Sequence, residues 1–179
     1  MVIVSDTREQ LPLDFSGIEG VDKVEEIGLA FGDYTAIVHE KPVPIVFDRK
    51  GLGDLFGTMT SGYNRWKVVM EKAKTANFKL ILIVEGTYSD VYQGFEHSQV
   101  SGESIIKKLH MLQVRYDLET VFCESRRMMA RYIVGLFSAV ERNWAKENSK
   151  TISNLGVNSP IPSKEPRSLV GESNLNDAD

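Results

Sequence analysis

The sequence predicts an α/β fold, in which a mixed central β-sheet is flanked by α-helices. Short runs rich in valine and isoleucine alternate along the chain with longer segments whose apolar residues recur at helical spacing. The chain has 179 residues, of which 42% are hydrophobic. This length and composition are typical of one globular domain with a substantial core, so a second full domain is not expected.

The expected strands are short and rich in β-branched residues. They are residues 2–5, 21–28, 33–38, 45–49, 78–84 and 121–123. The third and fourth flank His39-Glu40-Lys41-Pro42, which predicts an antiparallel hairpin. The run at 78–84 is almost entirely apolar, as is typical of a strand buried on both faces.

Helical spacing of apolar residues predicts four helices. They are residues 51–60, 63–76, 101–115 and 125–147. The last helix has an unusually wide apolar face, which favours either two buried surfaces or one well-covered core helix. Its apolar residues are Met128, Met129, Tyr132, Ile133, Leu136, Phe137, Val140 and Trp144. Residues 86–95 carry three aromatic side chains, and we expect a loop there that either packs over the sheet edge or stacks on unpaired bases.

We expect two regions in the chain, a folded domain at 1–148 and a polar, flexible tail at 149–179, where serine, asparagine, proline and glycine predominate. Cys123 is the single cysteine, so no disulfide can form within the chain, and a reduced intracellular setting is expected. The opening Met-Val-Ile-Val lacks the charged start of a signal peptide, and no apolar run reaches membrane-spanning length. We therefore expect a soluble, cytoplasmic protein with no membrane partner.

The charge distribution favours a local rather than a general affinity for nucleic acid. The net charge is −4, which argues against a protein that coats nucleic acid. Residues 49–79, however, contain seven basic and two acidic side chains, a net charge of +5. Lysine and arginine at such a density are able to neutralise phosphates, although solvated helix faces also carry them.

The predicted hairpin brings two carboxylates and a lysine to one face of the sheet. Asp33 and Asp48 lie symmetrically about residues 40 and 41, so this register sets them opposite each other with Cβ atoms about 5 Å apart. Strand alternation returns Lys50 to the same face and turns Arg49 away from it. Two close carboxylates suit a hard divalent ion such as Mg²⁺, and the lysine is able to hold an attacking water. A lone Asp-x-Lys is also common on solvated surfaces.

Three separated motifs carry a family resemblance. They are Ser5-Asp6-Thr7-Arg8-Glu9, Phe31-Gly32-Asp33-Tyr34, and Asp48-Arg49-Lys50 followed by Asp54. In this order they resemble the nuclease domain of the XPF family of structure-specific endonucleases, over residues 2 to about 145. The resemblance implies a restriction-endonuclease-like core that cuts branched or flap DNA with Mg²⁺ or Mn²⁺, and a homodimer, for which the last helix is a candidate interface.

The resemblance also implies roles for individual residues. Asp33 and Asp48 would bind the metal, Lys50 would orient the water, and Asp6 would add a ligand, tune the site or simply cap a turn. Arg49 is expected in a structural ion pair with Asp54 or a neighbouring carboxylate, or in contact with phosphate, and Arg8 with Glu9 in a similar pair. The candidate DNA contacts are Arg8, Arg65 and Lys67.

Two departures from the family pattern keep three function classes open. The family glutamate is Asp48 here, one methylene shorter, and misplacement of about 1 Å can cost about a hundredfold in rate. Residues 149–179 do not resemble the tandem helix-hairpin-helix modules of many relatives, so a separate DNA-targeting partner is possible. The leading prediction is an Mg²⁺-dependent endonuclease acting in replication, recombination or repair. The alternatives are a catalytically silent DNA-binding subunit and a nuclease that prefers single-stranded DNA or RNA.

Overall fold

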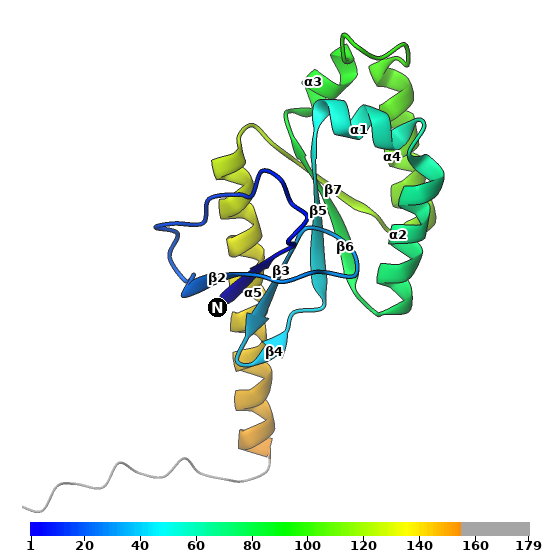
Figure 1. The fold of residues 1–179 in the computed structure, drawn as a ribbon. Coiled ribbons are helices and arrows are strands. Elements are labelled where there is room, and N and C mark those ends of the chain that lie inside the picture. Colours follow the sequence, from blue (N-terminus) through cyan, green and yellow to red (C-terminus); the bar gives the residue numbers. More distant parts are fainter. Residues whose placement is uncertain (155–179) are drawn as a thin grey trace, which may run out of the picture. The chain divides into compact units, whose positions relative to one another are not determined.

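A mixed β-sheet organises the chain in the computed structural model, which describes residues 1–154 (Figure 1). The strands are β1 (Val2–Ser5), β2 (Lys23–Glu26), β3 (Tyr34–Val38), β4 (Lys41–Pro42), β5 (Ile45–Gly51), β6 (Lys79–Glu85) and β7 (Glu119–Cys123). Their order is β2-β1-β3-β5-β6-β7, with β4 beside β3. The β1–β3 and β3–β5 pairs are antiparallel, whereas β1–β2, β5–β6 and β6–β7 are parallel. The predicted mixed sheet is therefore confirmed.

Helices cover both faces of this sheet. They are α1 (Leu52–Met59), α2 (Tyr63–Thr75), α3 (Tyr88–Gln93), α4 (Gly102–Tyr116) and α5 (Arg126–Asn154). Within Met1–Trp144, α5 lies against one face, and α1, α2 and α4 lie against the other (Figure 1). Helix α5 continues to Asn154, beyond the predicted start of the tail at residue 149. The remainder of that tail, residues 155–179, lies outside the described residues.

Strand β6 shows why the sheet needs helices on both sides. Ile81 and Ile83 belong to the core beneath α5, whereas Leu80, Leu82 and Val84 belong to the core beneath α1, α2 and α4. Side chains alternate between the faces of a strand, and a strand buried on both faces is apolar at nearly every position. The same alternation places Phe47 of β5 under α5 and leaves Asp48 for the opposite face.

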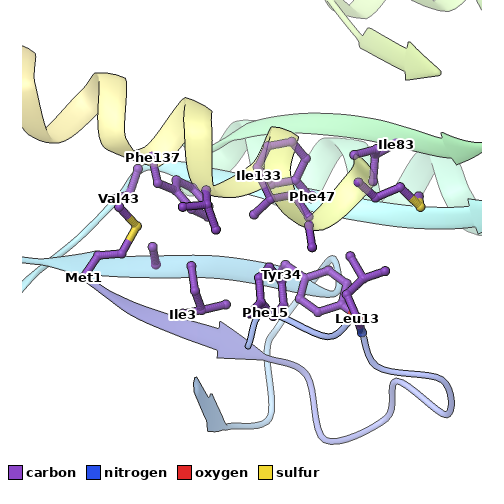
Figure 2. Close-up of a cluster of buried hydrophobic side chains, with 14 of the residues drawn as sticks. Met1, Ile3, Leu13, Phe15, Tyr34, Val43, Phe47, Ile83, Ile133 and Phe137 are labelled. Atoms are coloured by element: carbon purple, nitrogen blue, oxygen red, sulfur yellow. The ribbon is translucent and has the colours of Figure 1, made fainter. Parts of the chain in front are cut away.

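The core under α5 explains the width of that helix's apolar face. Ile133 and Phe137 point into the cluster, where the Phe137 ring lies edge-on to Phe47 with ring centroids 5.5 Å apart (Figure 2). The flanking residues Tyr132, Leu136, Val140 and Trp144 are partly buried and pack against the same cluster. Met128, with 49% of its surface exposed, is the exception. The wide face is therefore largely used within the chain, which favours a well-covered core helix.

The turn of the predicted hairpin is tighter than expected, because residues 41 and 42 of the expected connection 39–42 form β4 and only His39 and Glu40 make the turn. Both residues have positive φ, 49° and 63°, as a tight two-residue turn requires. The register from β3 then shifts by two residues, from Ile37 opposite Pro42 to Tyr34 opposite Phe47.

Pro44 lies at this shift, and it has no N–H group to donate to a ladder. The Thr35 hydroxyl lies 3.3 Å from the carbonyl of Val43 and 2.8 Å from that of Ile45, so it bridges the gap. Because the shift is even, every side chain of β5 keeps the face predicted for it.

The expectation of a loop at residues 86–95 is wrong, because α3 forms there. Thr87 and Asp90 make a capping box: the Thr87 hydroxyl accepts from the Asp90 N–H at 3.1 Å, and the Asp90 carboxylate accepts from the Thr87 N–H at 2.7 Å. Tyr88 and Phe95 then pack edge-on or tilted against Phe122 and Phe56, with ring centroids 5.8 and 5.9 Å apart. Packing, rather than a mobile base-stacking loop, accounts for these two aromatics.

Gly102 fixes how closely α4 approaches the end of α3. A Cβ atom at this position would lie 2.0 Å from the carbonyl oxygen of Val91 and 2.4 Å from that of Tyr92. We predict that Gly102→Ala lowers the free energy of unfolding by about 2 kcal/mol, because neither carbonyl is free to move without disturbing α3. Gly135→Ala in α5 is the matched control. With nothing within 4 Å of its added methyl, it should gain up to about 1 kcal/mol. Urea unfolding of both variants checks this, and equal stabilities would contradict it.

Candidate active site

Gly32 sets the position of the first carboxylate. Its φ is +70°, and a Cβ atom there would lie 2.4 Å from Val46 Cγ2 and 3.0 Å from the Phe47 carbonyl oxygen. Only glycine allows both the conformation and this close approach. Asp33, the next residue, donates its N–H to the Phe47 carbonyl at 2.7 Å and accepts the Asp6 N–H on its own carbonyl at 2.8 Å. Its backbone is thus fixed between β1 and β5.

Asp48 and Lys50 extend from β5 toward α2. Tyr34 lies opposite Phe47, and Asp33 directly precedes β3, so the structure brings the Asp33 and Asp48 side chains to the same cleft, as the sequence predicted. Asp48 is only 5% exposed, and both of its oxygens are engaged. Lys50 Nζ donates to Oδ1 at 2.7 Å, and the indole Nε1 of Trp66 donates to Oδ2. Trp66 was missed from the sequence, because its spacing in α2 predicts only a core position.

Burial and, after it, the nearby charge of Asp48 raise the pKa of Asp33 to about 7. A hydrogen bond from the Arg49 N–H at 2.6 Å and the charge of Lys50 oppose this rise without cancelling it. Burial lowers the pKa of Lys50, but Asp48 and more distant carboxylates outweigh it, so that pKa is raised overall. The site therefore holds more negative charge than its own lysine neutralises.

This donor set fits a hard divalent cation. Among residues 1–154, no three histidine, cysteine, aspartate or glutamate side chains are grouped so that they could hold a metal ion. Two carboxylates remain, Asp33 and Asp48, and Mg²⁺ is commonly held by one or two carboxylates together with waters and phosphate oxygens. A cation between them would also offset the repulsion that raises the Asp33 pKa.

Asp6 lines the cleft as a buried carboxylate with a different partner. Arg8 donates to its carboxylate from Nε at 3.1 and 3.0 Å and from its backbone N–H at 3.0 Å. Burial raises the pKa of Asp6, but these contacts outweigh burial and hold it below the usual value. The predicted pairing of Arg8 with Glu9 is therefore wrong, because each of them binds another residue.

Arg49 occupies the opposite face of the sheet, as strand alternation predicted. It binds Glu9 through two hydrogen bonds of 3.0 Å, and its Nη1 lies 3.5 Å from Glu85. The Arg49 and Glu9 side chains are only 9% and 6% exposed. The hydrogen bonds that Arg49 donates to Glu9 are the first cause of the raised pKa of Arg49. The predicted structural ion pair exists, but its partners are Glu9 and Glu85 rather than Asp54. The ion pair between Arg49 and Glu9 holds the segment after β1 against β5.

The remaining predicted residues divide between the cleft and its surroundings. The cleft has a volume of about 330 Å³, and Arg65 lines it together with the two carboxylates and Lys50. Arg8 also lines it, although Asp6 engages its guanidinium. Lys67 is outside the lining. Asp54 is exposed in the first turn of α1, and its charge contributes to the raised pKa of Lys50.

Residues 5–136 match the family described as the ERCC4 domain. The chain belongs to this family. Among solved structures it is similar to XPF from Aeropyrum pernix, with a TM-score of 0.62 and 18% identity, over 87% of this chain and 72% of that one. It is also similar to XPF from Aeropyrum pernix in complex with DNA, with a TM-score of 0.58 and 19% identity, over 82% of this chain and 66% of that one. A comparison with curated proteins finds no match.

These comparisons confirm the predicted family and fold class, a restriction-endonuclease-like core of the ERCC4 type. The chain spans just under two thirds of the DNA-bound relative's length. Within the part of the chain that the structure describes, no helix is both long enough and apolar enough to cross a membrane.

The raised pKa of Asp33 predicts a specific pH dependence of stability. The pKa of Asp33 in the folded protein, about 7, lies above the ordinary value of 3.8. The stabilisation that comes from protonated Asp33 is therefore complete below pH 4 and is lost as the pH rises through 7. We predict that Asp33→Asn is more stable than the parent at pH 8 in EDTA, by on the order of 2 kcal/mol, because one pKa unit corresponds to about 1.4 kcal/mol.

Asp6→Asn is the control with the opposite sign. Because the pKa of Asp6 is lowered, its ionised form stabilises the fold above pH 4, and removing that charge should reduce stability at pH 8. Thermal unfolding between pH 4 and pH 8 measures both variants. An Asp33→Asn variant less stable than the parent at pH 8 would contradict the assignment.

Proposed function

We propose that the chain is a metal-dependent DNA endonuclease that hydrolyses phosphodiester bonds in branched, flap or nicked DNA. The observation that carries the proposal is the group Asp33, Asp48 and Lys50, which lies on one sheet face in an open cleft lined by Arg65. The ERCC4 family membership and the DNA complex of a relative support the same reaction class.

Asp33 and Asp48 would hold the divalent ion, Mg²⁺ with Mn²⁺ as a substitute. When bound, such an ion polarises a phosphoryl oxygen and lowers the pKa of an attacking water. In the reaction the water oxygen forms a bond to phosphorus while the phosphorus–oxygen bond to the leaving strand breaks. The proton that the water gives up passes to solvent, and the leaving oxygen takes up a proton from solvent. Asp48 belongs to β5, and Asp33 directly precedes β3 with its backbone hydrogen-bonded to Phe47 and Asp6, so both carboxylates have fixed backbone positions.

Lys50 acts as a charge stabiliser and a holder of the water rather than as a base. Its pKa is raised by Asp48 and Asp33, so the ammonium stays protonated and has only hydrogen bonds to donate. With Nζ 2.7 Å from Asp48 Oδ1, it lies where negative charge develops on the phosphoryl group. We assign Arg65 to contact with the DNA backbone, and we assign Asp6, which is paired with Arg8, to tuning the charge of the cleft.

A second candidate is a catalytically silent DNA-binding subunit of the same fold. It is favoured by the two hydrogen bonds that engage both oxygens of Asp48, from Lys50 and Trp66. For catalysis, the bond from Lys50 must yield or be shared when a cation binds. A homodimer and a separate DNA-targeting partner remain predictions from the family resemblance, and so does an intracellular, DNA-associated location. The surface of α5 that suggested a dimer interface is mostly packed against the chain's own core.

A cleavage panel tests the proposal. Labelled flap, fork, nicked, duplex and single-stranded DNA, and RNA, are incubated with Mg²⁺ or Mn²⁺. We predict that Asp33→Ala and Lys50→Ala lose at least about a hundredfold in rate, because each removes charge from the reacting centre. Lys107→Ala, which removes an exposed lysine paired with Glu103, should retain the parent rate.

The panel also separates the alternatives. Binding of DNA without cleavage under either metal would overturn the nuclease and support the silent subunit. Preferential cleavage of single strands or RNA would keep the reaction and change the substrate class.

A further inference from the structure

A second cavity adjoins the active-site cleft along α2. It has a volume of about 510 Å³ and shares Ala30 and Phe31 with the cleft. Helix α2 lines both: Arg65 faces the cleft, and Val68, Lys72 and Thr75 face the second cavity. These positions recur every three or four residues, so they form one stripe on the helix. We call the surface formed by Ala30, Phe31, Arg65, Val68 and Lys72 the α2 groove.

The α2 groove combines an apolar floor with free cations. Val68 is 49% exposed and Phe31 is half-buried, so two apolar side chains face solvent close to the charged centre. Within residues 1–154, neither Arg65 nor Lys72 forms an ion pair or a side-chain hydrogen bond. Glu71 is the one acidic side chain in the lining of the second cavity, and α2 as a whole carries four basic residues and one acidic residue. The surface therefore favours a ligand that is anionic and has apolar faces.

Phe31 connects this surface to the reacting centre. Its ring is held edge-on against Phe78, with ring centroids 5.5 Å apart, so it is a fixed part of the floor. It directly precedes Gly32 and Asp33, whose conformations are constrained by β5. A DNA strand lying over Phe31 would therefore reach the cleft that Asp33 and Asp48 line.

We propose that the α2 groove binds single-stranded DNA, as the unpaired strand adjoining the scissile phosphate; the proposal rests on the nuclease function above. Single-strand sites combine basic residues for the backbone with apolar or aromatic surfaces for the bases, whereas a duplex keeps its base faces stacked inside. From Arg65 to Lys72 the helix rises about 10 Å. The two cations are spaced to contact phosphates on either side of bases that lie against Val68 and Phe31.

Binding without cleavage tests the groove. Fluorescence anisotropy in EDTA is measured with a labelled twelve-nucleotide oligothymidine and with a blunt hairpin duplex. We predict that Lys72→Glu weakens binding of the single strand about tenfold, because it replaces a phosphate contact by a repulsive charge. Lys74→Glu is the matched control. It makes the same charge change on the same helix, but Lys74 faces a different cavity, and its effect should stay below about twofold.

The apolar floor has its own pair of variants. Val68→Ser should weaken single-strand binding several-fold, and Val114→Ser, at an exposed valine of α4, should not. Equal losses for Lys72→Glu and Lys74→Glu would overturn the groove in favour of diffuse attraction. If the variants lose the same affinity for single strand and duplex, the proposal is overturned and the surface binds duplex DNA. If single-strand binding is unchanged in all variants, the proposal is overturned and a protein partner becomes the candidate occupant.

Photocrosslinking of the unmodified protein to a bromouracil-substituted oligonucleotide gives an independent readout. Crosslinks within residues 30–31 or 65–76 are expected, and crosslinks confined to other segments would overturn the proposal. The two proposals fail separately. If the parent cleaves flap DNA but Lys72→Glu binds oligothymidine normally, the groove proposal alone is overturned. Absence of any cleavage with Lys72-dependent binding removes the nuclease alone.

Discussion

The close approach of the Asp33 and Asp48 carboxylates is the constraint on which the rest of the site depends. Two carboxylates side by side, one of them largely buried, are unfavourable in a folded protein unless a proton or a cation compensates them. In this chain the raised pKa of Asp33 shows the cost. The arrangement persists because the β3–β5 register and the close passage of Gly32 over β5 leave neither aspartate another position.

Structural features on both faces of the sheet maintain this arrangement. On the reverse face, the buried pair of Arg49 and Glu9 ties the segment after β1 to β5. The Arg49 N–H also donates to the Asp33 carboxylate. Arg49 therefore supports the site through its backbone, while its side chain lies on the opposite face of the sheet. On the cleft face, Trp66 and Lys50 donate hydrogen bonds to the two carboxylate oxygens of Asp48 and so fix its side chain.

Sequence reasoning reached the hairpin, the mixed sheet and the face shared by Asp33, Asp48 and Lys50, because these follow from strand alternation and local symmetry. It did not reach the partners of Arg49, since Glu9 lies forty residues away and only the folded sheet brings the two together. The hydrogen bond from Trp66 to Asp48 was not predicted for the same reason, because only the folded chain brings α2 against β5. The α3 helix was missed although its signal was present: Thr87 and Asp90 have capping-box spacing, but the glycines at 86 and 94 predicted a loop more strongly.

Proton release on metal binding tests the central claim most directly. Isothermal titration of the protein with Mn²⁺, in buffers of different ionisation enthalpy, gives the number of protons displaced per ion bound. Because the pKa of Asp33 is about 7, we predict about half a proton released at pH 7, almost none at pH 9, and none at either pH for Asp33→Asn. Binding without proton release at pH 7, or equal affinity in the Asp33→Asn variant, would contradict the account of a cation seated between Asp33 and Asp48.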